Sequence, residues 1–264
     1  MAITDKNVYL VYKNLHTVIG KDVNDNFISV NEYNDLLAGT FYPFIYSKTN
    51  AFLKGEAIPI EAIQSSALLA RLTYTEPVTP NAGLIDLHSG IGGELAYDYL
   101  FWVSAWTNTA YNGQRRRIKL VSTEELADIN MNMAKPRPDE YPLAVLSYNV
   151  ASGYYMGQVY PTDISSVKLS YIRKPTLPFL DYYIDTSYYR QYLEVGTDLT
   201  SITTGQYRDG NDMDDVATDS LTIEIDLPDS YIEEYMFVLL EKLEKRKPDY
   251  SGVQYSLAKQ GQNG

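Results

Sequence analysis

Leu221-Thr222-Ile223-Glu224-Ile225-Asp226-Leu227 leads through Pro228 and Asp229 into Ser230-Tyr231-Ile232-Glu233-Glu234-Tyr235-Met236-Phe237-Val238-Leu239-Leu240. Apolar and polar side chains alternate in the first run, which predicts a strand with one face in water. In the second run, Ser230 and Glu233 have the spacing of a capping box, and apolar side chains recur every three or four residues. Basic residues and then Pro248 follow, so we predict a helix over about 230–247. The chain therefore combines sheets with helices.

The N-terminal third has the apolar period of helices. Three segments each place apolar side chains on one helical face: Val8, Tyr12, Leu15 and Ile19; Tyr33, Leu36, Leu37 and Phe41; Ile60, Ile63, Ala67 and Leu68. We predict that Asp5 and Asn31 cap the first two helices and that Gly20 and Gly55 end them. Pro43 is expected to kink the second. The third helix is predicted from Pro59 to Leu72.

From residue 73 the pattern changes to short alternating runs separated by turns. The predicted strands are Leu84–Leu87, Tyr97–Ala105, Arg116–Val121, Leu143–Tyr148, Tyr154–Tyr160 and Val167–Arg173. Ser122 and Glu125 form a second capping box, which predicts a helix over about 123–134 that Pro136 and Pro138 terminate. Residues 196–219 contain few large apolar side chains and are interpreted as a long exposed loop.

These elements predict an α+β protein with a helical N-terminal region, residues 1–72, and a β-rich body, residues 73–264. The sheet is expected to be mostly antiparallel, because there are too few helical crossovers for a doubly wound fold. The C-terminal helix is expected to pack on the sheet.

Composition limits the chemistry available to the 264 residues. No cysteine is present, which excludes disulfides, thiolate metal sites and a cysteine nucleophile, and the two histidines, His16 and His88, are far apart in sequence. The formal net charge of −12 disfavours a protein that coats DNA by neutralising phosphates. We therefore expect a protein that is not an enzyme and has no cofactor. The 25 tyrosines suit either strand packing or contact surfaces that are alternately wet and buried.

Targeting signals are not evident in the sequence. Residues 1–6 lead into no apolar segment typical of a signal peptide. The most apolar run, Leu100–Trp106, is about a third of the length of a membrane span. These patterns are interpreted as those of a soluble protein.

Three short motifs resemble ligand sites only in part. His88-Ser89-Gly90-Ile91-Gly92-Gly93 lacks the third glycine of a dinucleotide fingerprint, because residue 95 is leucine. Asp22-Val23-Asn24-Asp25-Asn26 begins like a calcium loop, but Phe27 replaces the required glycine and Tyr33 the bidentate glutamate. The acidic run of Asp209, Asp212, Asp214 and Asp215 matches no defined cation site. The first two are interpreted as turns, cation binding by the acidic run is left open, and no catalytic, cofactor or metal residue is assigned.

The strongest basic cluster is Arg115-Arg116-Arg117 with Lys119. If this segment is a strand, Arg115, Arg117 and Lys119 share one face. A charged edge strand or an interface with ion pairs is favoured over a DNA contact.

Two further stretches carry a resemblance to a known family. Ile28-Ser29-Val30-Asn31-Glu32-Tyr33-Asn34-Asp35-Leu36-Leu37 is similar to a helix opening of ring proteins in the neck and tail of crAss-like phages of Bacteroidetes hosts. Val159-Tyr160-Pro161, followed by Val167–Pro175 and Pro178, resembles a strand and proline turn of those proteins. Other segments occur in the same order, loosely from about residue 28 to 258: Pro136, Pro138, Tyr141-Pro142, Leu221–Leu227 and Val253-Gln254-Tyr255. The chain differs from the family pattern at Leu95–Tyr99 and at Phe179-Leu180.

The resemblance implies a structural virion protein of the neck or tail, assembled in the host bacterial cytoplasm. Such proteins form homo-oligomeric, commonly dodecameric rings that act as adaptors (head-to-tail connectors). They lie between the portal protein and neighbouring ring or tail proteins, with no membrane partner. Genomic DNA passes through the lumen without specific binding, and an acidic lumen would let the duplex slide. The acidic segment 209–219 would face either the lumen or a neighbouring ring. A receptor- or glycan-binding virion module is the alternative, in which tyrosines stack on sugars.

Overall fold

The computed structural model describes residues 8–22, 28–53, 57–90, 93–108, 115–131, 141–216 and 218–246. The chain divides into two compact units. One comprises Met1–Tyr46 and Thr176–Gly264, and the other comprises Ser47–Pro175. The boundary that the sequence suggested, between residues 72 and 73, lies inside the second unit, because helix α4, Ala67–Leu72, leads directly into the first strand of its sheet.

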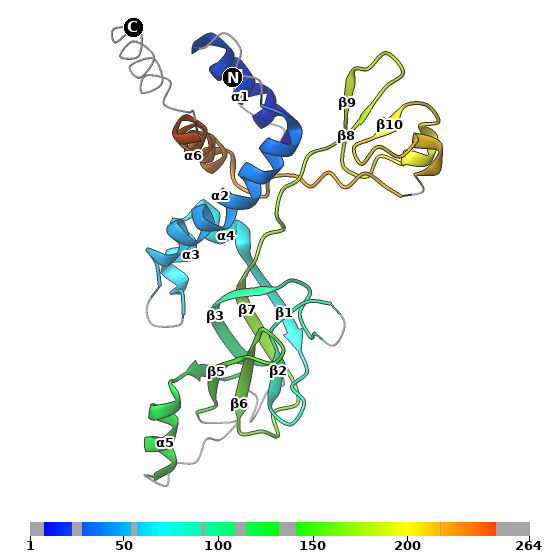
Figure 1. The fold of residues 1–264 in the computed structure, drawn as a ribbon. Coiled ribbons are helices and arrows are strands. Elements are labelled where there is room, and N and C mark those ends of the chain that lie inside the picture. Colours follow the sequence, from blue (N-terminus) through cyan, green and yellow to red (C-terminus); the bar gives the residue numbers. More distant parts are fainter. Residues whose placement is uncertain are drawn as a thin grey trace, which may run out of the picture. The chain divides into compact units, whose positions relative to one another are not determined.

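The unit Ser47–Pro175 is built around a seven-stranded sheet of order β1-β7-β3-β4-β5-β6-β2 (Figure 1). Its strands are β1 Thr73–Val78, β2 Leu84–Asp86, β3 Tyr99–Thr107, β4 Arg117–Leu120, β5 Leu143–Asn149, β6 Tyr154–Tyr160 and β7 Val167–Arg173. Of the strand pairs in this described sheet, only β4 and β5 run parallel. A crossover containing helix α5, Thr123–Met131, connects these two strands, as parallel neighbours require. The expectation of a mostly antiparallel sheet is confirmed.

One face of this sheet buries the main apolar core of the unit. Its largest buried side chains are Trp102 and Tyr171, which lie among aliphatic residues such as Ile85, Val159 and Leu169. Two short helices, α3 Ile60–Ser65 and α4 Ala67–Leu72, precede β1. The single helix predicted from Pro59 to Leu72 is therefore wrong. The backbone of Ser66 is extended, and its side chain caps α4 by accepting a hydrogen bond from the N–H of Leu69.

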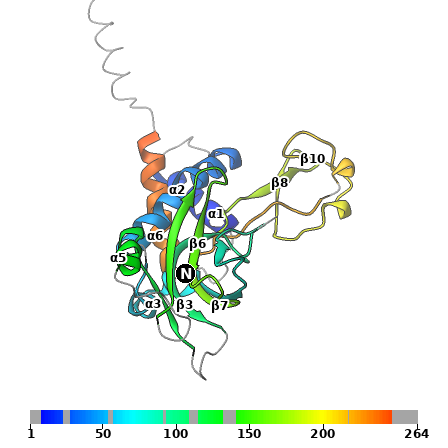
Figure 2. The same ribbon diagram turned by 90° about the horizontal axis from the view of Figure 1, so that it is seen from below.

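The helices described in the other unit are α1 Val8–Asp22, α2 Val30–Asn50 as far as Tyr46, and α6 Asp229–Arg246 (Figures 1 and 2). Tyrosines join these helices through both the ring and the hydroxyl of the side chain. Tyr33 is fully buried and donates to the carbonyl of Val8. Tyr235 of α6 packs against Phe41 and Phe44 of α2, and its hydroxyl lies 2.8 Å from that of Thr40. The buried face of α6 thus carries the ring of Tyr235 toward α2 within this unit, and the expected packing of α6 on the sheet stays a prediction.

The helix ends differ in detail from the predictions. Helix α1 continues past Gly20 to Asp22. Helix α2 is capped by Ser29 and not by Asn31, because Ser29 and Glu32 form the reciprocal hydrogen bonds of a capping box. Pro43 lies inside α2.

The two remaining capping boxes have different outcomes. The capping box of Ser122 and Glu125 is confirmed. Ser230, the residue predicted to cap the C-terminal helix, lies instead within the first turn of α6, which begins at Asp229. The predicted caps and ends at residues 5, 55, 136, 138 and 248 lie outside the described residues.

Residues 179–226 of the same unit form a small module, coloured yellow-green to orange in Figures 1 and 2. Strands β8 Asp181–Ile184, β9 Arg190–Leu193 and β10 Gln206–Tyr207 make a three-stranded sheet of order β10-β8-β9. Two short 3-10 helices follow the loops, η1 Leu199–Ser201 and η2 Met213–Asp215. Leu193, Leu199, Tyr207 and Met213 bury a core of their own. The prediction of a long exposed loop over 196–219 is therefore wrong, since three of its few large apolar residues anchor successive turns.

Residues 221–227 are also not a strand, although their alternation is that of one. Only Ile223 forms a bridge, with Phe179, and no strand of the described chain continues the pairing. Thr222, Ile225 and Leu227 are buried, while the hydroxyl of Thr222 is used by the backbone of Asp181 and Leu193. The segment is held by side-chain contacts in place of a hydrogen-bonded ladder. Both classes of secondary structure are nevertheless present, and the protein is α+β.

Within the described residues, no helix is both long and apolar enough to cross a bilayer.

Candidate functional site

Four exposed residues form a row across the outer face of the seven-stranded sheet. The strand register places Pro77 of β1 opposite Lys168 of β7, Lys168 opposite Trp106 of β3, and Trp106 opposite Arg117 of β4. Directly paired residues project from the same face of a sheet, and all four are exposed, with Trp106 retaining 42% of its accessible surface. We call these residues the cation–tryptophan row. It places an indole between two cations on a rigid scaffold.

The strand β4 explains why both cations of its exposed face point to solvent. Arg117 and Lys119 are exposed, whereas Ile118 between them is buried in the core. The predicted shared face is therefore confirmed for Arg117 and Lys119, whereas Arg115 lies before the strand and is exposed. Lys119 lies 3.8 Å from Glu125 of α5, a solvent-exposed pair of little energetic weight. The side chain of Arg117 forms no ion pair within the described part of the chain.

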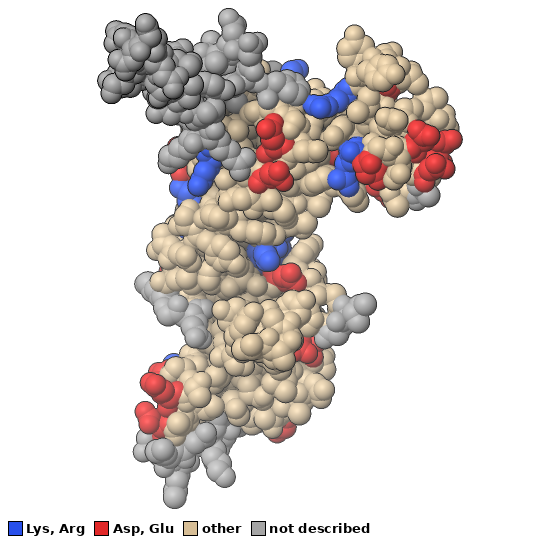
Figure 3. Space-filling view, in the orientation of Figure 1, with Lys and Arg blue, Asp and Glu red and all other residues tan. Residues whose placement is uncertain are grey.

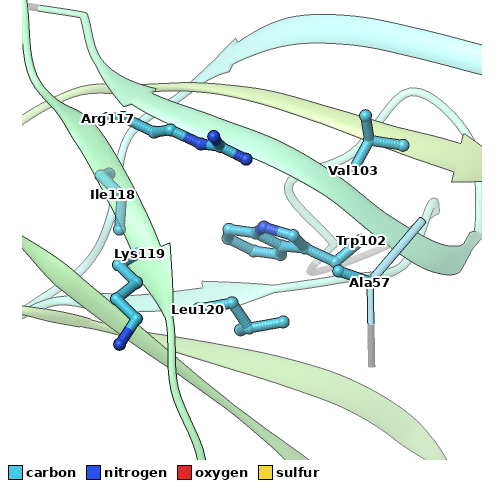
Figure 4. A pocket seen from close by; sticks show the side chains of 7 residues that line it. All are labelled: Ala57, Trp102, Val103, Arg117, Ile118, Lys119 and Leu120. Atoms are coloured by element: carbon cyan, nitrogen blue, oxygen red, sulfur yellow. The ribbon is translucent and has the colours of Figure 1, made fainter. Parts of the chain in front are cut away.

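A cavity of about 340 Å³ opens beside the row, between β3 and β4 (Figure 4). Trp102 and Val103 line it from β3, Ala57 lies beside Trp102, and the residues 117–120 line it from β4. In Figure 4 the side chain of Arg117 extends from β4 toward β3, while Lys119 points away from Trp102. The indole is almost fully buried. The cavity thus has an aromatic wall and one cation at its rim, which suits an acidic or planar group.

The hairpin of β5 and β6 carries a second exposed aromatic surface. Tyr148 and Tyr155 are cross-strand partners whose rings meet edge to face, with centroids 5.2 Å apart. Tyr154 is also exposed and stacks on His88 at 4.1 Å. Val150 in the intervening turn is 85% exposed. Large apolar side chains gathered at a hairpin in this way indicate a contact surface.

The most elaborate polar arrangement is buried in the small module and centres on Asp181, whose side chain is fully buried. One carboxylate oxygen accepts from the N–H of Tyr182 and lies 2.9 Å from Nε of Arg208. The other accepts from the hydroxyl of Tyr207 at 2.5 Å and from the N–H of Leu221 at 2.9 Å. Burial raises the pKa of Tyr207, and the hydrogen bond it donates to Asp181 acts in the same direction. The carboxylate is enclosed and saturated with donors, so it has a structural role and offers no open position for a substrate or metal.

In the glycine-rich motif that begins at residue 88, of which Ile91 and Gly92 lie outside the described residues, the N–H of Gly93 donates to the carbonyl of Gly90. Asp98 accepts hydrogen bonds from both the N–H and the hydroxyl of Ser89, at 3.0 and 2.8 Å. Burial opposes ionisation of Asp98, but these bonds and the charge of Lys174 outweigh it and lower its pKa. Nearby, burial and then the charge of Asp86 raise the pKa of the Glu94 carboxyl to about 7.

The acidic run at residues 209–215 does not converge on a point in space. Asp209 is tied to Asn211 by its own hydrogen bonds, and Asp212 begins η2. Among the described residues, no group of three or more acidic or histidine side chains could hold a metal ion. The calcium-like motif lies outside the described residues except for Asp22, which ends α1.

Three members of the row, Pro77, Trp106 and Lys168, were not recognised from the sequence. Trp106 was visible only as part of an apolar run, and Lys168 only as a polar residue of a strand. The one signal that could have found them is alternation. Lys168 and Trp106 each point away from the buried neighbours of their strands, Leu169 and Ala105. Their proximity depends on strand register, which no local pattern contains.

Comparison with models of known protein families and with curated proteins finds no match for this chain.

Proposed function

We propose that this chain is a structural virion protein that assembles with copies of itself into a ring. The observation that carries the proposal is the amount of large aromatic surface left exposed on rigid strands, namely Trp106 on the sheet and the β5–β6 hairpin with Tyr148, Tyr154 and Tyr155. Tyrosine, tryptophan and arginine are enriched where proteins bind one another. A subunit whose partners are further proteins would bury these side chains on assembly.

The place of the ring follows from the family resemblance and from charge. The ring would act as a connector between the portal and the tail and bind the portal protein and neighbouring ring or tail proteins. With a net charge of −12, copies of the chain would repel the phosphate backbone, so genomic DNA could pass through the lumen without specific binding. Its location would be the neck or tail of the virion, after assembly in the host cytoplasm. No reaction is proposed for it.

Native mass spectrometry of the purified chain, combined with negative-stain imaging, tests this function. We expect a closed ring of about twelve copies with a central hole, either alone or after mixing with portal protein. A chain that stays monomeric at high concentration and also fails to bind portal would contradict the proposal.

A receptor- or glycan-binding virion module is the second candidate. The exposed rings of Tyr148 and Tyr155 on one hairpin favour it, because flat aromatic faces can stack on sugar rings. Saturable binding to a carbohydrate array by isolated subunits or trimers, lost in Tyr148→Ala/Tyr155→Ala, would support this function over the ring.

A further inference from the structure

The cation–tryptophan row has the properties of a binding surface that lacks its partner. Neighbouring strands lie about 4.8 Å apart, so the row from Pro77 to Arg117 spans about 14 Å across three strand spacings. Neither Lys168 nor Arg117 forms an ion pair with any described residue. Lys168 and Arg117 lie on either side of the half-exposed indole of Trp106. Such a combination of aromatic and cationic side chains is typical of an interface hot spot, where apolar burial and charge both contribute to binding.

The chemistry of the row favours an acidic protein segment over nucleic acid. Non-specific DNA binding depends on many phosphate contacts, whereas the row offers two unpaired cations, with Arg115 at its edge. The rest of the chain carries a large excess of acid, which repels DNA but not a local acidic segment that meets these cations directly.

The small module of this same chain presents such a segment. The 3-10 helix η2 and the residue before it carry Asp212, Asp214 and Asp215, all exposed. Acidic side chains gather over this part of the module in Figure 3. Met213 between them is fully buried, so the turn is anchored and its aspartates project from fixed backbone positions. Asp214 and Asp215 accept no hydrogen bond and form no ion pair among the described residues.

The geometry points to a head-to-tail contact between two copies of this chain, in which the aspartates of η2 in one copy dock on the cation–tryptophan row of the next. The inference rests on the proposed ring and names the surfaces that would join its subunits. Because the two surfaces differ, each copy uses its η2 aspartates in one contact and its cation–tryptophan row in the other. Contacts of this heterologous kind generate rings when the rotation between copies closes.

Complementary charge variants test the contact. Lys168→Glu/Arg117→Glu destroys only the basic surface, and Asp214→Lys/Asp215→Lys destroys only the acidic one. In analytical ultracentrifugation each variant alone should associate at least about tenfold more weakly than the wild-type chain. An equimolar mixture offers two complementary contacts, one with the native charges and one with both charges reversed, and should form assemblies in which the two variants alternate. A chain with all four substitutions should recover association, since both surfaces are reversed together.

Matched controls separate this contact from a general effect of charge. Lys13→Glu/Lys242→Glu and Glu61→Lys/Asp163→Lys make the same changes in net charge at exposed positions elsewhere and should leave association unchanged. Circular dichroism should show that every variant is folded.

The outcomes distinguish the contact from the ring itself. Rings that persist in both charge variants would overturn the contact and leave the ring function standing, whereas a wild-type chain that never associates would overturn both. Binding of a labelled oligonucleotide that disappears in Lys168→Glu/Arg117→Glu, without any loss of self-association, would assign the row to nucleic acid instead. Assemblies of a single variant in place of mixed assemblies would also refute the head-to-tail arrangement.

Discussion

Replacing Asp181 by alanine should destabilise the small module far more than the loss of any exposed carboxylate on its surface. The change leaves Arg208 without its counter-ion and removes the acceptor of the Tyr207 hydroxyl and of the Leu221 N–H. Removing one partner of a buried pair costs about 3–5 kcal/mol, and each unsatisfied buried donor about 1–3 kcal/mol. The side chain of Arg208 is 28% exposed and can recover some hydration. We therefore expect a loss near the lower end, about 3–4 kcal/mol.

Two measurements check this magnitude. Urea unfolding followed by near-UV circular dichroism gives the free energy of unfolding, and hydrogen exchange of residues 181–222 reports whether the loss is confined to the module. Asp214→Ala is the matched control, because its exposed carboxylate has no described partner, and it should change stability by no more than about 0.5 kcal/mol.

A double substitution tests the physical cause. Arg208 lies over the rings of Phe179 and Tyr207, with its guanidinium 4.8 and 5.3 Å from their centroids. Methionine would keep much of this packing without the charge. If the unpaired charge causes the loss, Asp181→Ala/Arg208→Met should be more stable than Asp181→Ala alone. A single variant within about 1 kcal/mol of the wild type would refute the reasoning.

Three further predictions concern the rest of the chain. The folded pKa of Glu94, about 7, exceeds its ordinary value of 4.5, so the folded state binds the extra proton and stability should fall as pH rises from about 4.5 to about 7. In Glu94→Gln the melting temperature should depend less on pH across that range. An unchanged pH dependence would exclude this carboxyl as the cause. Gly205→Ala should lower the melting temperature, because its φ is 110° and an added Cβ would meet the carbonyl oxygen of Ile184; a melt equal to that of the wild type would contradict this. Trp102→Ala should cost about 3–5 kcal/mol in urea unfolding, as expected for a buried indole, and a loss below about 1 kcal/mol would show that the cavity beside it relaxes.

The strands were the most predictable part of the fold. Val167–Arg173 and Tyr154–Tyr160 match β7 and β6 residue for residue, because each alternates between core and solvent and is bounded by turns. Strand β1 was missed, since Pro77 and Glu76 obscure the pattern. Pro77 is tolerated because β1 is an edge strand with β7 as its single neighbour in the described sheet.

Predictions failed where long-range contacts override a local pattern. The alternation of Leu221–Leu227 is genuine, but a strand needs a neighbour along its whole length, and the described chain provides one only at Phe179. The converse holds for residues 196–219, which contain little apolar material. Three apolar side chains are enough to form a core there, those of Leu199, Tyr207 and Met213. They are enough because Asp181 binds Arg208, Tyr207 and Leu221 and thereby holds distant turns together. No periodicity encodes such a carboxylate.

The candidate site also depends on long-range contacts that no local pattern of the sequence predicts. Arg117 could be assigned to an exposed face from its own segment, because alternation around Ile118 is a local property. That Trp106 and Lys168 lie beside it is a property of register, and a shift of one residue in either pairing would send one of them into the core. The buried neighbours Ala105 and Leu169 forbid that shift. The same core packing that fixes the sheet therefore also places an indole between two cations on its outer face, and substitutions that loosen the register should weaken the proposed contact without altering any residue of the row.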